Sequence, residues 1–360
     1  MKGRRISILM AGGGTGGHLF PGISLAKNIE KIYSNCDITF FTTSKLIDKK
    51  IISYTKYRNC VNPMQAFPNS LSKSLNFFLT FFQSWYKTMI LFRKIKPDLI
   101  IGLGGYGAFS SCILAHKFDI PFVLLESNAT PGKVVRWLKK LANTIYATNL
   151  IQDLNEKNVK KLGLPIRFGN ISEQEIFGQD EKVTILVMGG SLGARLINRT
   201  ICDSLGYLNK MKEKLEFIHI AGKKVKEIKE YYDKNEINSQ VFEFCNDMLD
   251  IYKKCDLIVC RAGGGTLAEI TAIGIPSILI PIEHSSDDHQ KKNAFTIAKL
   301  GAGIVIEEEK VSGQILADSI LSLVKKKEKI EQMKQKAKSI GRPNAAKDIA
   351  TDIVKRILLK

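Results

Sequence analysis

Short apolar segments alternate with longer amphipathic stretches along most of the chain. In the first half these segments are ISILMA, DITFFTT, LIIGLGG and FVLLES, and in the second half VTILVMGG, EFIHIAG, LIVCRAGG and SILIPI. They are aliphatic and β-branched without a strict polar alternation, which is typical of strands buried on both faces. Because strands that alternate with helices form right-handed βαβ units, the pattern predicts an α/β protein with parallel sheets.

Two glycine-rich turns divide the chain into similar halves. AGGGTGGH follows the first strand at 11–18, and MGGSLGA follows a later one at 188–194. This internal similarity predicts two Rossmann-like domains that face each other across a cleft. A chain of 360 residues is also too long for one hydrophobic core. We expect an N-terminal domain over residues 1–163 and a C-terminal domain over 164–342, with a final helix over 343–360 packing back on the first domain.

Composition restricts the class of protein. The chain carries 54 Lys and Arg against 35 Asp and Glu, a formal charge of +19 that favours an anionic partner, although a generally lysine-rich surface would also explain it. Seven cysteines without a CxxC pair predict reduced thiols and a cytoplasmic protein. The basic start MKGRR is followed by too short an apolar run for an export signal, and no run reaches the ~18–20 apolar residues of a membrane-spanning helix.

The first glycine turn formally matches a dinucleotide motif, because Gly12, Gly14 and Gly17 satisfy G-x-G-x-x-G. A dinucleotide site also needs an acidic residue at the end of the second strand to bind the ribose. Here that strand ends in FFTTS, and Asp37 stands at its beginning. These features disfavour an NAD- or FAD-dependent oxidoreductase.

The segment CRAGGGTLAE at 260–269 predicts a phosphate site, because three glycines lead into a helix start with unpaired N–H groups. Within it, Glu269 follows Thr266 by three residues. The pair could form a capping box, or Glu269 could accept hydrogen bonds from a ribose diol. The segment alone leaves both interpretations open.

A polar loop after the next strand favours the nucleotide interpretation. EHSSDDHQKKNA supplies Asp287, Asp288, His289, Gln290 and Asn293 as partners for sugar hydroxyls, and MGGSLGAR adds Ser191 and backbone amides. Ligands of open parallel sheets bind beyond the carboxyl ends of the strands, where these loops lie. Three such loops in one domain predict a pocket for a nucleoside diphosphate.

The chain resembles the bacterial MurG family over roughly residues 5 to 355, because it contains seven motifs in the order and at the spacings of that family. The motifs are GGTGGHLFPG, GLGGYGAF, ESNATPGK, GLPIR, GGSLGAR, RAGGGTLAE and DDHQKKNA. The resemblance implies a GT-B fold and inverting transfer of N-acetylglucosamine from UDP-N-acetylglucosamine to lipid I, undecaprenyl-diphospho-muramoylpentapeptide. The acceptor atom would be the muramoyl 4-hydroxyl, and the product would be lipid II for peptidoglycan synthesis. No metal and no cofactor is implied.

The resemblance also assigns the candidate binding residues. The donor would be bound by Thr15, Gly16, Gly17, Asn128, Arg167, Ser191, Cys245, Gly264, Gly265, Thr266, Leu267, Ala268, Glu269 and Gln290. Among these, Glu269 would bind the ribose, Gln290 the sugar and the Cys245 backbone the uracil. The turn at 263–266 and Ser191 would bind the diphosphate, with Arg167 near the nucleotide. The acceptor diphosphate would lie against Gly13, Gly14, Gly104, Gly105 and Tyr106.

Four positions depart from the family pattern. Leu164 replaces an Asn, Leu125 and Ser127 replace the His and Gln of H-E-Q-N, and Cys245 replaces an Ile. If activity is retained, Leu125 excludes a universal catalytic role for that His. The change at Cys245 matters less, because a backbone contact tolerates another side chain.

Inverting transfer needs a base beside the acceptor hydroxyl. His18 is the first candidate, because an unperturbed imidazole pKa near ~6.5 suits proton abstraction, although His18 could instead orient the glycine turn or contact the acceptor diphosphate. Glu126 is the second candidate. No D-x-D pair is placed to bind a metal nucleotide, since SDDH at 286–289 lies within the loop assigned to the sugar.

The segment 71–96 predicts contact with a membrane. Its aromatic and aliphatic residues recur at helical spacing, at Leu71, Leu75, Phe78, Phe82, Trp85, Met89 and Phe92, with Phe77, Leu79, Phe81 and Ile90 beside them. Residues 49–97 hold nine Lys and Arg and no Asp or Glu. This composition suits peripheral docking on the anionic inner leaflet, at the cytoplasmic face of the membrane, whereas a buried core helix is the alternative.

Two other classes of protein fit the sequence less well. A nucleic-acid-binding module would explain the charge, but no homeodomain, RRM, KH or zinc-finger pattern is present, so we expect no nucleic-acid partner. Other GT-B enzymes are closer alternatives, namely a diacylglycerol glucosyltransferase or a UDP-N-acetylglucosamine 2-epimerase. The epimerase needs no lipid, and the aromatic and basic segment disfavours it.

Overall fold

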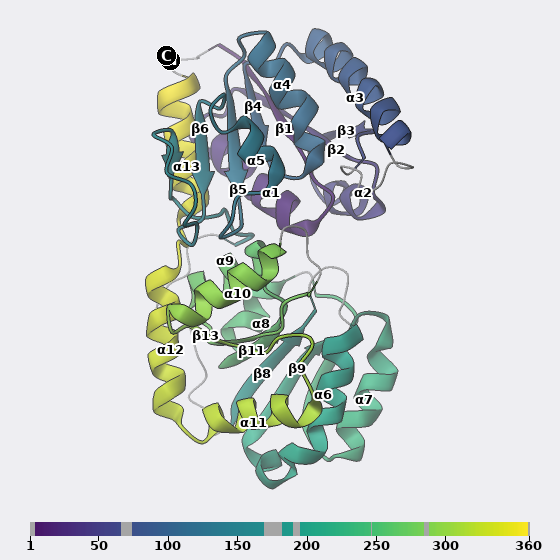
Figure 1. Ribbon diagram of the computed structural model, residues 1–360, viewed down its shortest axis with the longest axis vertical. Helices are drawn as coiled ribbons and strands as arrows, with labels where there is room; N and C mark the ends of the chain where they lie inside the picture. The colour runs from purple at the N-terminus through teal and green to yellow at the C-terminus, as the bar shows by residue number, and fades with distance from the viewer. Residues whose placement is uncertain are drawn as a thin grey trace. The chain divides into compact units, whose positions relative to one another are not determined.

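The computed structural model describes residues 4–65, 74–168, 182–189, 195–245, 247–283 and 288–358 (Figure 1). The chain divides into two compact units. The first comprises Met1–Gly169 together with Asn344–Lys360, and the second comprises Asn170–Pro343. Residues 164–169, which the sequence analysis assigned to the C-terminal domain, therefore group with the first unit.

The first unit is built on a parallel sheet that has seven strands among the described residues, in the order β3-β2-β1-β4-β5-β6-β7. The strands are β1 (Ile6–Ala11), β2 (Cys36–Thr43), β3 (Arg58–Asn62), β4 (Leu99–Gly102), β5 (Phe122–Glu126), β6 (Thr144–Ala147) and β7 (Val159–Lys160). The helices are α1 (Gly16–Ile32), α2 (Leu46–Ser53), α3 (Ser74–Ile95), α4 (Phe109–Lys117), α5 (Lys133–Leu138) and α13 (Ala345–Ile353). The order reverses between β1 and β4, which is where such sheets bind ligands.

Helices cover both faces of this sheet, and this explains why its central strands are mostly apolar without a polar alternation. In β1, Ile8 and Met10 pack into the core shared with α1, α2 and α13, whereas Leu9 and Ala11 pack into the core shared with α3, α4 and α5. Successive side chains of a strand point to opposite faces, so a strand covered on both sides needs apolar residues at every position.

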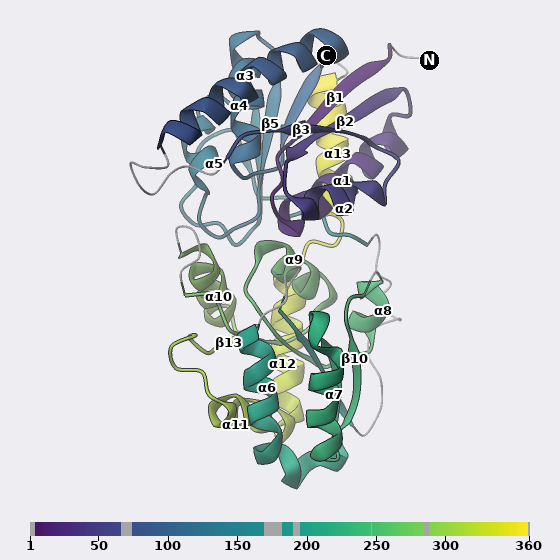
Figure 2. The same ribbon diagram turned by 90° about the vertical axis from the view of Figure 1, so that its right-hand side faces the viewer.

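The C-terminal helix α13 is held on the first unit by a carboxylate. Asp352 accepts a hydrogen bond from the Tyr146 hydroxyl at 2.7 Å and from the Lys160 ammonium at 2.6 Å, and it pairs with Arg356 at 2.9 Å. Figures 1 and 2 show α13 beside α1, and the two helices pack together. The chain thus returns to its first unit at its end.

The second unit repeats this architecture with six described strands in the order β10-β9-β8-β11-β12-β13, all parallel. The strands are β8 (Val183–Met188), β9 (Leu215–Ile220), β10 (Asn238–Phe242), β11 (Leu257–Cys260), β12 (Ser277–Leu279) and β13 (Gly303–Val305). The helices are α6 (Arg195–Leu208), α7 (Val225–Lys234), α8 (Met248–Lys253), α9 (Gly264–Ile273), α10 (His289–Lys299), α11 (Gly313–Val324) and α12 (Lys327–Ile340). The predicted α/β class with two Rossmann-like sheets is confirmed.

A buried histidine ties α6 to the sheet of the second unit. The Asn198 amide donates from Nδ2 to the Ala221 carbonyl at 2.9 Å, so its Oδ1 accepts from Nε2 of His219 at 3.2 Å. The other ring nitrogen, Nδ1, then accepts from the Tyr232 hydroxyl at 3.2 Å. Burial lowers the pKa of His219 from 6.5 to about 4, so the ring is neutral at physiological pH.

This histidine makes the stability of the second unit depend on pH. Below pH 6.5 His219 of the unfolded chain binds a proton, whereas His219 of the folded chain binds one only below about pH 4. The free energy of unfolding therefore falls as the pH drops through this window, by at most about 3 kcal/mol from this residue. We expect the midpoint of thermal unfolding to fall accordingly and the variant His219→Gln to show a flatter dependence. An equal slope in both proteins would show that another group is responsible.

Candidate functional site

The first glycine turn connects β1 to α1 in a conformation that only glycine adopts readily. Gly12, Gly13 and Gly14 have φ angles of +132°, +148° and +89°. The exposed Thr15 then precedes the first residue of α1, Gly16, in extended conformation. The turn leaves the carboxyl end of β1, next to the point where the strand order reverses.

A second glycine turn, after β4, packs against the first around His18. Gly104 and Gly105 have φ angles of +96° and +69°. A Cβ atom on Gly104 would lie 3.0 Å from Cδ2 of His18, and one on Gly105 would lie 3.0 Å from the Gly13 carbonyl oxygen. The structure thus brings together the residues predicted to bind the acceptor diphosphate, with Tyr106 directly following.

Hydrogen bonding defines the tautomer of His18. Its Nδ1 lies 3.1 Å from the Gly13 carbonyl oxygen and 3.3 Å from Oγ1 of Thr15. A carbonyl oxygen can only accept, so Nδ1 of the neutral ring carries the proton and Nε2 carries the lone pair. In this half-buried imidazole, Nε2 is therefore the ring nitrogen whose lone pair can accept a proton.

Glu126, the second candidate base, holds the loop that follows β5. Its Oε1 accepts from the backbone N–H of Asn128 at 3.0 Å and from the Asn128 amide at 3.1 Å, and its Oε2 accepts from Gly132 N–H at 2.8 Å. Burial raises the pKa of this carboxyl, and the hydrogen bonds from Gly132 and Asn128 oppose the shift. Because both carboxylate oxygens accept hydrogen bonds from this loop, the contacts favour a role of Glu126 in positioning the loop over a role as the base.

In the second unit, α9 begins at Gly264 with Gly263 as its N-cap residue, and the cap makes no side-chain hydrogen bond. Thr266 is therefore the third helical residue, so the capping-box interpretation is wrong. Glu269 is 5% exposed, and its Oε2 accepts from the Tyr252 hydroxyl at 3.0 Å. The partly exposed first turn of α9 directs its N–H groups and positive dipole end away from the helix, an arrangement that binds anions.

The remaining donor candidates lie on neighbouring loops of the second unit. The Gln290 amide accepts at Oε1 from the Ile282 N–H at 3.3 Å, beside Asp288 in left-handed conformation. The thiol of Cys245 donates to the Asp247 carbonyl at 3.1 Å. Ser191 lies outside the described residues, as does Asp287.

Leu125 and Leu164, which depart from the family pattern, and the predicted site residue Arg167 belong to the first unit, and the two leucines are core residues. Leu125 and Leu164 are buried, and Leu125 packs into the core beneath α1. The guanidinium of Arg167 lies over the ring of Phe20 on α1, with Cζ 4.7 Å from the ring centroid. A stacked Arg of this kind is held in one orientation.

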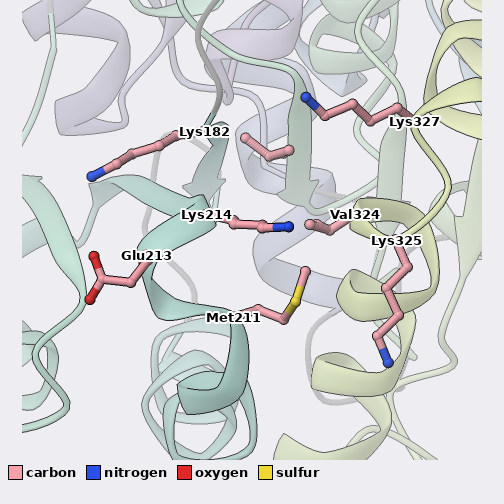
Figure 3. Close-up of a pocket in the computed structure, with 8 residues that line it drawn as sticks. Lys182, Met211, Glu213, Lys214, Val324, Lys325 and Lys327 are labelled. Atoms are coloured by element: carbon pink, nitrogen blue, oxygen red, sulfur yellow. The ribbon is translucent and has the colours of Figure 1, made fainter.

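A hollow in the second unit lies away from these loops. It measures about 810 Å³ and is lined by Lys182, Val183, Met211, Glu213, Lys214, Val324, Lys325 and Lys327. Figure 3 shows Lys214 extending toward Val324. Lys182 precedes β8 and Lys214 precedes β9, so the hollow is at the amino edge of the sheet, whereas the nucleotide loops leave the carboxyl edge.

Known proteins are similar to this chain in both sequence and architecture. The glycosyltransferase family 28 N-terminal domain matches residues 8–147, and the family 28 C-terminal domain matches residues 184–353. A relative from Myxococcus xanthus is 35% identical over 96% of this chain and 91% of its own length. It is named UDP-N-acetylglucosamine--N-acetylmuramyl-(pentapeptide) pyrophosphoryl-undecaprenol N-acetylglucosamine transferase. The chain belongs to this MurG family of glycosyltransferases.

Solved structures agree on the fold. The crystal structure of MurG from Acinetobacter baumannii has a TM-score of 0.78 at 24% identity, over 97% of this chain and 99% of that one. UDP-GlcNAc 2-epimerase from Neisseria meningitidis has a TM-score of 0.64 at 15% identity, over 98% and 100% of the two chains. The fold is therefore GT-B, and the MurG family is distinguished within it by sequence.

Replacing Gly104 with alanine tests the packing around His18. The variant Gly104→Ala adds a Cβ against the imidazole at a φ of +96°, so we expect kcat to fall at least tenfold in an assay of sugar transfer. Gly222→Ala is the matched control, because Gly222 also has a positive φ, +66°, but no atom within 4 Å of the added Cβ. Each change strains the backbone by about 1–2 kcal/mol, so equal losses of kcat would mean that strain alone is responsible.

Proposed function

We propose that this chain transfers N-acetylglucosamine from UDP-N-acetylglucosamine to the muramoyl 4-hydroxyl of lipid I, making lipid II. The observation that carries this proposal is the match, over nearly the full length, to curated relatives named for that reaction. The epimerase alternative shares only the fold, at 15% identity. The glycine turns and the α9 helix start supply the diphosphate contacts that such a reaction requires.

Most donor contacts belong to the second unit in this proposal, and Thr15, Gly16, Gly17 and Asn128 of the first unit would add to them. The first turn of α9, through Gly264, Gly265 and Thr266, would hold the diphosphate, and the buried Glu269 would accept hydrogen bonds from the ribose hydroxyls. Gln290 would contact the sugar, and the Cys245 backbone the uracil. These assignments rest on the family resemblance together with the part-exposed helix start.

The acceptor diphosphate would lie against the two glycine turns of the first unit. As the 4-hydroxyl oxygen attacks the anomeric carbon, His18 Nε2 takes its proton, and the bond from that carbon to the diphosphate oxygen breaks. UDP leaves, and the configuration inverts. Backbone N–H groups and the α9 dipole stabilise the departing charge without need of a metal in this scheme.

Helix α3 presents an apolar face to solvent, which supports docking on a lipid surface. Phe82 is 65% exposed, Phe78 55% and Leu79 53%, so the alternative of a fully buried core helix is wrong. Phe81 instead packs on Phe109 of α4, with ring centroids 6.3 Å apart. Leu71 lies outside the described residues. Within the described part of the chain, no helix is both long and apolar enough to span a bilayer.

The aromatic surface extends from α3 to α5. Phe109 contacts Trp137 with ring centroids 5.7 Å apart, and Trp137 is 52% exposed. Arg136, Lys139 and Lys140 flank this tryptophan in the sequence. Trp at a membrane interface and Lys and Arg near anionic headgroups are both favourable. The peripheral site on the inner leaflet would therefore include α5, which the sequence analysis missed.

A direct assay tests the proposed reaction. Radiolabelled UDP-N-acetylglucosamine is incubated with the purified protein and a short-chain lipid I analogue. We expect label to enter the lipid with release of UDP, and no transfer to diacylglycerol. Conversion of the donor to an epimerised sugar nucleotide, with no labelled lipid, would contradict the proposal.

The Tyr252–Glu269 hydrogen bond offers a test of donor binding. Removing the hydroxyl in Tyr252→Phe leaves the buried carboxylate less restrained, and hydrogen bonds to charged groups contribute about 1.5–3 kcal/mol. We expect the KM for UDP-N-acetylglucosamine to rise roughly tenfold with little change in kcat. Tyr232→Phe, another buried tyrosine of this unit, should lower stability and leave this KM unchanged. Equal KM effects in both variants would count against a specific role of Glu269.

A charged substitution on α3 tests membrane docking. Phe82→Glu places a carboxylate on the exposed face, so we expect co-sedimentation with vesicles containing anionic phospholipid to fall severalfold. Tyr207→Glu, at a 53% exposed aromatic on α6, should bind vesicles like the unchanged protein. If Phe82→Glu binds as well as the control, α3 is not the docking surface.

A further inference from the structure

A buried carboxylate beneath the first glycine turn has no part in the mechanism above. Asp48, on α2, is fully buried. It accepts hydrogen bonds from Gly14 N–H at 2.7 and 2.9 Å, from Thr43 N–H at 3.0 Å and from the Thr43 hydroxyl at 2.6 Å. A buried charge persists only where such donors compensate its loss of hydration. Asp48 therefore joins the end of β2 to the turn after β1.

The carboxylate fits closely against the backbone of the turn. A Cβ atom on Gly13 would lie 2.5 Å from Oδ2 of Asp48. From the other side, the ammonium of Lys45 donates to the Gly14 carbonyl at 3.1 Å. Both polar backbone groups of Gly14 are thus held by side chains from the start of α2.

One peptide group links this carboxylate to His18. The Gly13 carbonyl and the Gly14 N–H belong to the same planar trans peptide, so they point in opposite directions. The N–H points to Asp48, and the carbonyl oxygen accepts from His18 Nδ1 at 3.1 Å. Because both flanking residues are glycines, rotation of this peptide meets little steric resistance, and the hydrogen bond to Asp48 is what fixes its direction.

We propose that Asp48 is a positioning residue for sugar transfer, which fixes the Gly13–Gly14 peptide and so keeps the proton of His18 on Nδ1 and the lone pair on Nε2. This inference rests on the proposed function, in which His18 is the base. Without Asp48, the peptide can rotate, the Gly13 carbonyl turns away, and the imidazole loses both its tautomer and its orientation. The donor contacts of the second unit, at the α9 helix start and Glu269, should not change.

The test is a double-mutant cycle. Asp48→Asn places an amide N–H₂ among N–H donors, and we expect kcat to fall about ten- to a hundredfold while the KM for UDP-N-acetylglucosamine stays within about twofold. In a His18→Ala background, the same change should have almost no further effect on kcat, because its target is already absent. Equal losses in both backgrounds, or an unchanged kcat in Asp48→Asn, would overturn the proposal.

A control separates positioning from plain destabilisation. Asp98 accepts from Ser7 N–H at 2.8 Å at the amino end of the same sheet. We expect Asp98→Asn to lower the thermal midpoint as Asp48→Asn does, without affecting kcat. A loss of kcat in Asp98→Asn equal to that in Asp48→Asn would reduce Asp48 to a structural role.

A measurement that needs no activity distinguishes failure of the Asp48 proposal from failure of the proposed function. Nitrogen-15 NMR of the imidazole should show the Nδ1–H tautomer of His18 in the unchanged protein and a mixture of both tautomers in Asp48→Asn, because the Gly13 carbonyl no longer accepts from Nδ1. The same single tautomer in both proteins would contradict the positioning role. If the unchanged protein transfers no sugar while this change of tautomer is present, the proposed function fails and the Asp48–His18 linkage stands.

Discussion

The chemistry of this molecule depends on where its glycine turns direct their peptide groups. In each unit every strand of the sheet is parallel to its neighbours, so all turns that follow strands leave one edge. Glycines there let another group approach the backbone closely, and a Cβ atom on Gly104 would lie only 3.0 Å from Cδ2 of His18. Main-chain N–H groups, held at fixed angles, would then bind the diphosphates, and the Gly13 carbonyl would orient the base His18.

Turns this rich in glycine need external support, and buried polar side chains provide it. Asp48 holds the turn after β1, and Glu126 the loop after β5. Asn62 donates to the Gly107 carbonyl at 2.8 Å beneath the turn after β4, and Asn293 donates to the Ala262 carbonyl at 3.0 Å before α9. Each is buried with its hydrogen bonds satisfied, which makes the loop conformation specific.

Periodicity and turn chemistry were sufficient to predict the α/β class, the two parallel sheets and the glycine turns. They could not resolve contacts that depend on tertiary neighbours. Glu269 could belong to a capping box until the structure placed the helix start at Gly264. The neighbour α4 covers Phe81 and leaves Phe82 exposed, a distinction invisible in the spacing alone. Asp48 lies 34 residues from Gly14 in an ordinary amphipathic stretch, so its link to His18 has no local signal.

The most direct test of this account is the metal dependence of transfer, because peptide groups and a helix start are proposed to hold the leaving diphosphate. Initial rates with UDP-N-acetylglucosamine and a lipid I analogue would be measured in EDTA and again after magnesium is restored. The account predicts the same kcat in both conditions. A rate that disappears with the chelator and returns with magnesium would contradict it.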